Sequence, residues 1–190
     1  MGGAIAQTIA ISHPSRLLSL ILIFAPTYNP NLPQPKPKIK NLLRSPPVTD
    51  RNAYVEREIN RFRIISGSGF PLDEEWIRHT SARAYDRSYY PEGIKRHLLA
   101  RLACGNLRPA LPSVTAPTLV IHGEEDPFLP VENGMDAAEA IPGAELMIIK
   151  GMGHYPPHRG PWPGIVKAIS AHTRQTVELG SDQAYDLKFN

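Results

Sequence analysis

The sequence has little cysteine, no long hydrophobic run and almost no excess of charge. Cys104 is its single cysteine in 190 residues, which excludes an internal disulfide and a cysteine-rich zinc site. The longest apolar run, residues 17–24, is interrupted by Ser19 and is too short to cross a bilayer. A net charge of +3 is too small to mark a nucleic-acid-binding surface. With no cleavable signal visible, we expect a cytoplasmic protein that binds neither nucleic acid nor membrane.

Proline, in contrast, is abundant, with 20 residues against 14 glycines. Seven of these prolines fall within residues 26–47, which predicts an extended connection there. Three helices are expected after it. Thr49 is a candidate cap for the first, which ends near residue 65; Asp73 starts the second, which runs through residue 84; and Pro91 lies in the first turn of the third, which ends near residue 105. We therefore predict an inserted helical cap, or lid, over residues 26–116.

Short apolar segments flank this insertion. Residues 17–24, 118–122 and 145–149 are each closed by proline or glycine, and their length favours strands buried on both faces. Helices are expected at residues 1–13, 131–141 and 164–178. This alternation predicts an α/β fold with a parallel sheet, whose core comprises residues 1–25 and 117–178 and is followed by a polar tail at 179–190.

Two side chains that could take part in catalysis follow two of the predicted strands. Asp126 comes just after residues 118–122, and His154 follows residues 145–149 within Gly-Met-Gly-His. Because parallel strands end at the same edge of a sheet, both side chains are expected at that edge. A carboxylate that accepts from one imidazole nitrogen leaves the other nitrogen free to take a proton from a nucleophile. Asp126 and His154 are therefore candidate catalytic residues.

Asp126, His154 and the polar residues near them also have non-catalytic interpretations. Asp126 before Pro127 is also a good turn former, and His154 is also consistent with an ordinary loop position. Glu124 and Glu125 are expected to be solvated, and His122 is expected to pack at the end of a strand or to line a pocket. The remaining histidines share no spacing with carboxylates or cysteine that predicts a metal site, and no cofactor is expected.

The order of these motifs resembles the C-terminal part of an α/β-hydrolase. The opening segment Met1-Gly-Gly-Ala-Ile-Ala-Gln is similar to the residues that follow the nucleophile in the Gly-x-Ser-Met-Gly-Gly elbow of esterases in that family. The Asp126 loop, the Gly-Met-Gly-His154 loop and the inserted helices occur in the family's order, so the resemblance covers residues 1–178. The chain looks most similar to the aclacinomycin methylesterase-like carboxylesterases.

This resemblance implies a serine-type hydrolase of carboxylic esters, with Asp126 as the acid and His154 as the base. The matching nucleophile is the residue immediately before Met1, and the backbone N–H at Met1 matches one oxyanion donor of the family. We therefore expect the isolated chain to lack activity. Two alternatives remain open: a non-catalytic remnant that binds a ligand or partner, and an epoxide or haloalkane hydrolase if the preceding residue is aspartate.

Nothing else in the sequence replaces the missing serine. Ser68 lies in Ser-Gly-Ser-Gly, but an elbow centred on it needs glycine where Ser66 and Phe70 stand, so this segment is interpreted as a linker between cap helices. Cys104 is expected to be a small buried hydrophobe. The cap aromatics either shape an apolar acyl pocket or pack within the cap; they are Trp76, Tyr85, Tyr89 and Tyr90. The expected partner is a small ester, and we expect self-association through an exposed sheet edge.

Overall fold

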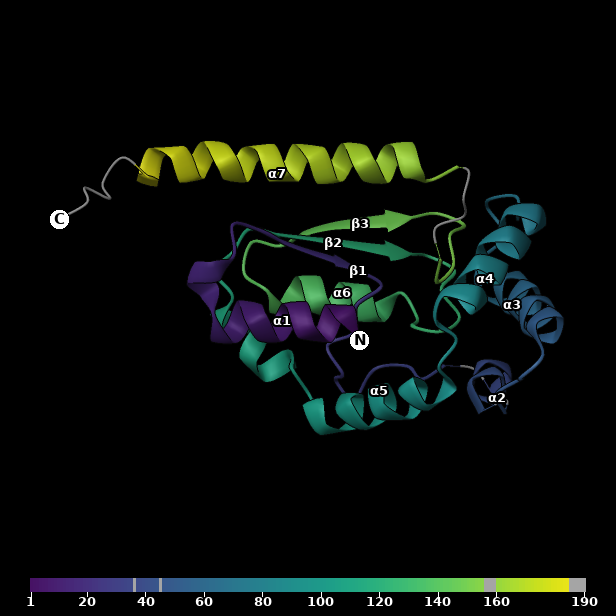
Figure 1. Ribbon diagram of the computed structural model, residues 1–190. Helices are drawn as coiled ribbons and strands as arrows, with labels where there is room; N and C mark the ends of the chain where they lie inside the picture. The colour runs from purple at the N-terminus through teal and green to yellow at the C-terminus, as the bar shows by residue number, and fades with distance from the viewer. Residues whose placement is uncertain (36, 45, 156–159, 185–190) are drawn as a thin grey trace.

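A three-stranded parallel sheet forms the centre of the molecule (Figure 1). The computed structural model describes residues 1–35, 37–44, 46–155 and 160–184. The strands β1 (Leu20–Ile23), β2 (Thr118–Gly123) and β3 (Glu145–Ile149) lie side by side in sequence order. Leu22 pairs with Val120, which pairs in turn with Leu146. All three strands therefore end at one edge of the sheet.

Helices cover both faces of this sheet, which confirms the predicted α/β class. The helices α1 (Gly2–Ser12) and α6 (Glu132–Ala140) lie on one face, and α7 (Trp162–Ala184) lies on the other (Figure 1). All six residues of β2 are buried. Their side chains alternate between two apolar clusters, as a period of two residues requires. Val120 belongs to the cluster on the α1 and α6 side, and Ile121 belongs to the cluster that includes Ile165 of α7.

Two expectations about the strands need correction. The predicted strand at residues 17–24 is shorter, because a 3-10 turn at Pro14–Arg16 precedes it and only Leu20–Ile23 pair with β2. The segment 145–149 forms a strand with the predicted bounds, but it is not buried on both faces. Glu145, Leu146 and Ile148 are exposed, because β3 is an edge strand and its described neighbours cover it only in part.

Between residues 26 and 116, the described residues form four α-helices rather than the three expected: α2 (Pro37–Arg44), α3 (Arg51–Ile65), α4 (Glu74–Ser88) and α5 (Pro91–Cys104). A 3-10 helix at Arg108–Ser113 follows them. The helix α2 interrupts the segment that was expected to be extended. Asp50, not Thr49, caps α3, because its Oδ1 accepts a hydrogen bond from the backbone N–H of Ala53 at 2.7 Å. Asp73 caps α4 as predicted, and α5 begins at Pro91 and ends before Gly105.

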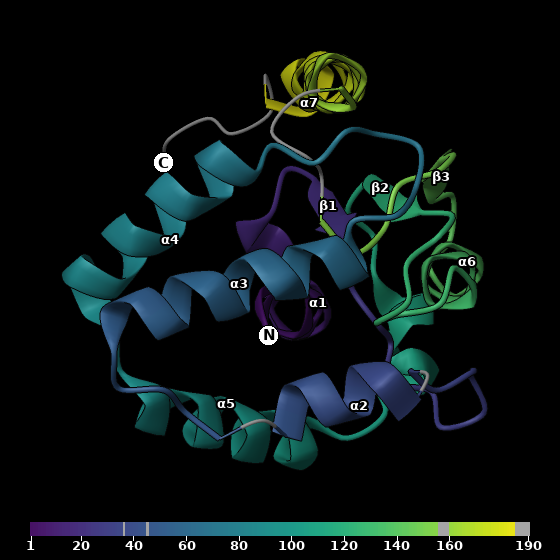
Figure 2. The ribbon, with the colours of Figure 1, turned by 90° about the vertical axis from the view of Figure 1, so that its right-hand side faces the viewer.

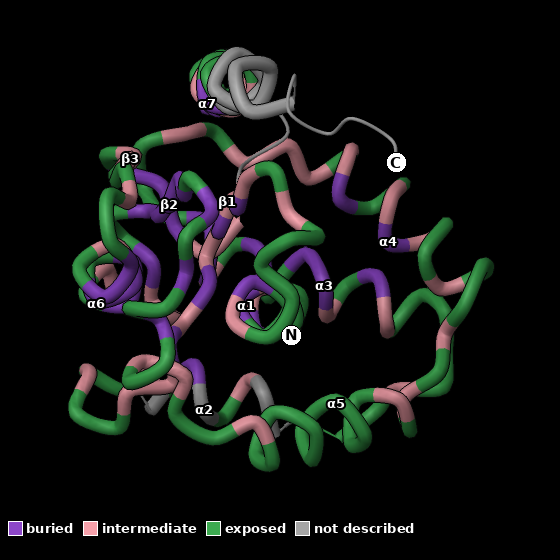
Figure 3. Tube along the Cα trace, turned by 90° about the vertical axis from the view of Figure 1, so that its left-hand side faces the viewer, coloured by how far each residue is buried: buried purple, intermediate pink, exposed green. Residues whose placement is uncertain are grey.

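The helices α2, α3 and α4 lie beyond the edge at which the strands end (Figures 1 and 2). They share an apolar cluster that includes Ile39, Ile59 and Ile77, and Phe128 from the loop after β2 packs against it. The helix α5 differs from them, because it buries none of its residues (Figure 3). Cys104, predicted to be buried, is only half-buried for this reason. Across the described residues, every helix is too short or too polar to span a membrane.

Candidate active site

Two loops meet at the edge where the strands end. The loop after β2 carries Asp126, and the loop after β3 carries His154. Backbone bonds between the loops continue the strand pairing: the N–H of Glu124 donates to the carbonyl of Ile149 at 3.1 Å, and the N–H of Glu125 donates to that of Met152 at 2.9 Å. The loop after β3 turns at Gly151, whose φ of +70° favours glycine. The sheet and these bonds together fix the relative position of the two loops.

The structure brings Asp126 and His154 into direct contact. Nδ1 of the imidazole lies 2.7 Å from Oδ2 of the carboxylate. The other carboxylate oxygen, Oδ1, accepts from the backbone N–H groups of Phe128 at 2.8 Å and Leu129 at 2.7 Å. The Asp126 side chain is fully buried, whereas that of His154 keeps 24% of its surface exposed. With a carboxylate at Nδ1, that nitrogen carries the proton and Nε2 keeps its lone pair for an incoming group.

Aromatic rings hold the His154 imidazole from two sides. The ring of Phe128 stacks on it with 4.5 Å between centroids, and the ring of Phe24 lies 5.3 Å away. Phe24 comes directly after β1 and has a positive φ of 50°, which is uncommon for a residue with a side chain. Such strain is kept only where the surrounding structure enforces it. The imidazole is therefore restrained by packing as well as by Asp126.

His122 is a further residue of this site, for which the sequence indicated only a strand end or a pocket wall. It is fully buried in β2, and its Nε2 lies 2.8 Å from the carbonyl of Leu129 and 3.5 Å from Oδ2 of Asp126. Burial lowers the pKa of His122, and the bond to Leu129 and the charge of Asp126 oppose this effect only in part. The neutral ring donates to Leu129 and so supports the turn that holds Asp126.

The two glutamates before Asp126 are exposed, as expected, but they are not merely solvated. Glu125 accepts hydrogen bonds from the backbone N–H and the hydroxyl of Ser68 at 2.7 and 2.8 Å. Glu124 accepts from the backbone N–H of Gly151 at 3.2 Å. The segment Ser66–Gly69 joins α3 to α4, as the linker interpretation requires, and it also contacts both loops of the site.

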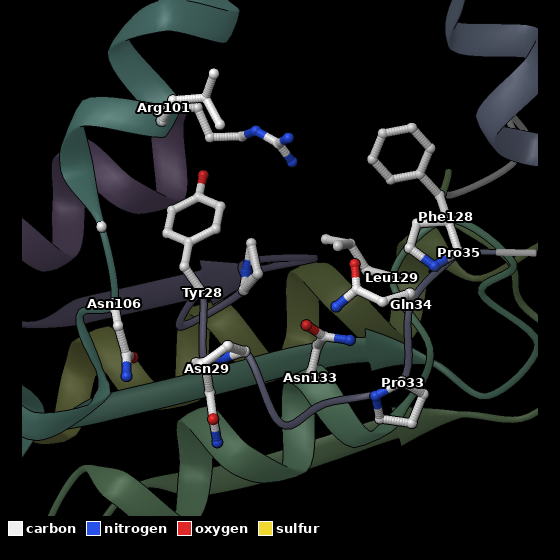
Figure 4. Close-up of a pocket in the computed structure, with 14 residues that line it drawn as sticks. Tyr28, Asn29, Pro33, Gln34, Pro35, Arg101, Asn106, Phe128, Leu129 and Asn133 are labelled. Atoms are coloured by element: carbon white, nitrogen blue, oxygen red, sulfur yellow. The ribbon is translucent and has the colours of Figure 1, made fainter.

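A cavity of about 380 Å³ adjoins the loop that carries Asp126 (Figure 4). Phe128 and Leu129 form one side of it, while Tyr28 and Arg101 approach from the other. Burial raises the pKa of the Tyr28 hydroxyl, and the nearby Arg101 charge offsets this rise only in part. The prolines at 26, 30, 33 and 35 complete much of the wall. This cavity combines an apolar lining with a few polar groups, as small-molecule sites commonly do.

The four aromatic residues considered above for an acyl pocket do not line this cavity. Trp76 lies 6.3 Å from the ring of Tyr155, and Tyr85 and Tyr89 lie 5.4 and 5.1 Å from the ring of Tyr54. Packing between α3 and the residues in and after α4, and against the His154 loop, therefore accounts for these three rings. Tyr90, the fourth, is exposed.

Met1 precedes the first turn of α1, where its carbonyl accepts from the N–H groups of Ala4 and Ile5 at 3.0 and 3.1 Å. This end of α1 lies toward the edge of the sheet at which the strands end (Figure 1). Met1 also lines a second cavity, of about 240 Å³, together with Ile5, Ile9 and Cys104. Within the described ranges, no group of three or more His, Cys, Asp or Glu side chains is arranged to hold a metal ion.

The chain is similar in sequence to known hydrolases. The model of the alpha/beta hydrolase family matches residues 1–167. A rhodomycin D methylesterase of Streptomyces peucetius is 29% identical over 92% of this chain and 64% of its own length. A 2-hydroxy-6-oxononadienedioate/2-hydroxy-6-oxononatrienedioate hydrolase of Dechloromonas aromatica is 31% identical over 82% of this chain and 53% of its own length. The chain thus spans between half and two-thirds of these relatives.

Solved structures agree on the fold. A 2-hydroxy-6-oxo-6-phenylhexa-2,4-dienoate hydrolase from Rhodococcus superposes with a TM-score of 0.67 at 20% identity, covering 92% of this chain and 61% of that one. A thermophilic esterase from Thermogutta terrifontis superposes with a TM-score of 0.61 at 25% identity, covering 92% and 62%. The three-stranded sheet described above is therefore part of a larger fold in these proteins.

Proposed function

Because the chain belongs to the alpha/beta hydrolase family, we propose that it is the acid- and base-bearing part of a serine-type hydrolase of carboxylic esters. The observation that carries this proposal is the 2.7 Å contact between Nδ1 of His154 and Oδ2 of Asp126. The contact leaves Nε2 of a partly exposed imidazole available as a general base. The similarity to a methylesterase supports an ester as the substrate.

In the proposed reaction, Nε2 of His154 takes the proton of the attacking hydroxyl. At the same time, the oxygen of that hydroxyl bonds to the carbonyl carbon of the ester. The buried Asp126 carboxylate stabilises the resulting imidazolium and keeps its own charge. His154 then gives the proton to the leaving alcohol, and water completes the cycle by the same two transfers. The nucleophile is proposed to precede Met1, whose backbone N–H would then donate to the carbonyl oxygen as it becomes negative.

The inserted residues 26–116 are proposed to act as a cap over this site, and residues 1–25 and 117–178 as the core. The cavity between the Asp126 loop and Tyr28 is the proposed place for the substrate, because Phe128 lines it and also stacks on His154. Its proline-rich wall favours a small to medium apolar ester.

The test compares the 190-residue chain with the same chain extended upstream through the residue before Met1. We expect the 190-residue chain to show neither labelling by a fluorophosphonate nor turnover of an activated ester above its His154→Ala control. The extended chain should show both, and His154→Ala should abolish its turnover. Turnover by the 190-residue chain that His154→Ala removes would mean that the nucleophile lies within it.

The extended chain also separates the remaining alternatives. An aspartate before Met1, with turnover of an epoxide or haloalkane instead of an ester, would favour that second hydrolase class. Ligand binding without turnover of either substrate type would favour a non-catalytic binding role. Both outcomes would contradict the ester hydrolase proposal.

We further propose that the 190-residue chain self-associates. In the described part of the chain no strand pairs with the outer edge of β1. Large apolar side chains are also exposed on neighbouring helices, among them Ile5 on α1 and Leu99 on α5. Unpaired strand edges and exposed apolar surface both promote association. A single monomeric species in sedimentation velocity, unchanged over a wide concentration range, would contradict this proposal.

A further inference from the structure

The linker Ser66–Gly69 lies directly against the loop that carries His154. The backbone N–H of His154 donates to the carbonyl of Ile65 at 2.7 Å, and that of Gly153 donates to the carbonyl of Ser66 at 2.8 Å. In return, the N–H of Gly69 donates to the carbonyl of Gly151 at 2.8 Å. These bonds join two segments that are far apart in sequence, and they hold the His154 loop on both sides of Met152.

Glycines permit this close approach. A Cβ atom at Gly153 would lie 1.9 Å from the carbonyl oxygen of Ile65, and one at Gly69 would lie 2.8 Å from Cα of Gly151. Gly67 has a φ of +80°, which lets the linker reverse its course at the crossing. The backbones therefore touch without side chains between them, so a displacement of the linker is passed directly to the His154 loop.

Glu125 binds the linker Ser66–Gly69 to the loop that carries Asp126. Its carboxylate accepts from both the backbone N–H and the hydroxyl of Ser68, and such charge-assisted bonds are stronger than neutral ones. The backbone N–H of Glu125 donates to Met152 in the His154 loop. Glu125, which directly precedes Asp126, therefore contacts both the linker and the His154 loop.

We propose that Ser68 and Glu125 are positioning residues that hold the His154 imidazole against Asp126 through the cap linker. The His154 loop needs this restraint, because two glycines flank Met152 and give that backbone wide freedom. Since the linker joins α3 to α4, a shift of these helices alters the placement of His154. The catalytic meaning of the restraint depends on the proposed function, whereas the restraint itself is measurable without turnover.

The experiment measures hydrogen exchange by NMR in the 190-residue chain. In Ser68→Ala, which removes one of the two hydrogen bonds to Glu125, we expect about tenfold faster exchange of the Gly153 and His154 amides. In Glu125→Ala, which removes both bonds, exchange of these amides should be at least as fast as in Ser68→Ala. The low-field Nδ1–H signal of His154 should broaden, because that proton then exchanges faster with water. Amides of β2, such as that of Val120, should keep their wild-type rates.

Matched controls and conservative variants complete the test. Ser113→Ala also removes an exposed hydroxyl with one hydrogen bond, to the carbonyl of Ala110, and should change neither the Gly153 nor the His154 signals. Ser68→Thr and Glu125→Gln keep a hydroxyl and an acceptor oxygen, and should restore most of the protection. Unchanged exchange at Gly153 and His154 in both alanine variants would overturn the proposal. Equal acceleration at Val120 would also overturn it, because it would indicate a general loss of stability.

The same variants separate this inference from the proposed function. In an extended chain that turns over an ester, Ser68→Ala and Glu125→Ala should lower kcat with KM nearly unchanged, because the base is misplaced while the cavity is intact. If exchange responds as expected but no extended chain turns over any ester, the restraint stands and the hydrolase proposal fails. If turnover occurs and exchange does not respond, the positioning role fails alone.

Discussion

Thr27 and Asp136, 109 positions apart in sequence, share a buried hydrogen bond of 2.5 Å. The bond ties the segment after β1 to α6, and Asn29 and Arg108 donate to the same carboxylate at 3.0 and 2.6 Å. Burial alone would raise the pKa of Asp136, but these three donors together lower it below its ordinary value. This network anchors the segment after β1 and the residues after α5 to α6.

Thr27→Val tests that anchor. It keeps the shape of the side chain but removes the donor, so the buried carboxylate loses one charge-assisted bond. We expect the free energy of unfolding at pH 7 to fall by about 1.5–3 kcal/mol in urea denaturation. The difference from wild type should narrow below about pH 4, where the unfolded carboxyl takes up a proton. Thr115→Val, at an exposed position, should change stability by less than about 0.5 kcal/mol.

His122 should make stability depend on pH. Because burial lowers its pKa, the unfolded chain binds a proton at a pH where the folded chain does not. Stability is therefore fully present above the unfolded pKa of about 6.5 and falls as the pH drops through the lower folded pKa. In His122→Gln, which keeps an N–H donor, the free energy of unfolding should change less between pH 7 and pH 5. His79→Gln, on the exposed side of α4, is the matched control and should keep the wild-type slope. Equal slopes in wild type and His122→Gln would contradict the assignment.

Gly153→Ala tests the backbone crossing at the site. The new Cβ would lie 1.9 Å from the Ile65 carbonyl oxygen and 2.6 Å from the Gly67 nitrogen, so the two segments must separate. We expect a loss of about 1–3 kcal/mol in the free energy of unfolding and weaker protection of the His154 amide. Gly2→Ala meets no atom within 4 Å and lies in a helix, so it should be neutral or slightly stabilising in the same denaturation experiment.

The exposed apolar side of α5 should contribute to self-association. Leu99 and Leu102 keep 66% and 64% of their surface exposed. The double change Leu99→Gln and Leu102→Gln should shift the sedimentation distribution of the 190-residue chain towards monomer. The reason is that less apolar surface is then buried when two chains associate. Lys95→Gln with Arg96→Gln, on the same helix, should leave the distribution as in wild type. The same shift in both double variants would contradict a specific contribution of the two leucines.

Sequence pattern located most elements of the fold because their signals are local. Asp73 and Pro91 marked helix starts correctly, since capping and the fixed φ of proline act within one turn. The helix α2 was missed, because the prolines around it dominated the local signal. The exposure of β3 and of α5 was also missed, since a sequence states how apolar a segment is and not what lies against it.

For the candidate site, the sequence by itself determined that an acid and a histidine follow two successive parallel strands. Chain order and strand ends are enough to place Asp126 and His154 at one edge of the sheet. Only the tertiary structure decided the contact between them and its supports: His122 beside the turn that holds Asp126, and Ser68 and Glu125 beside the His154 loop. Ser68 and Glu125, for example, are 57 positions apart and are joined by two hydrogen bonds. Such pairs leave no periodic pattern in a chain, because they arise only when separate loops meet in space.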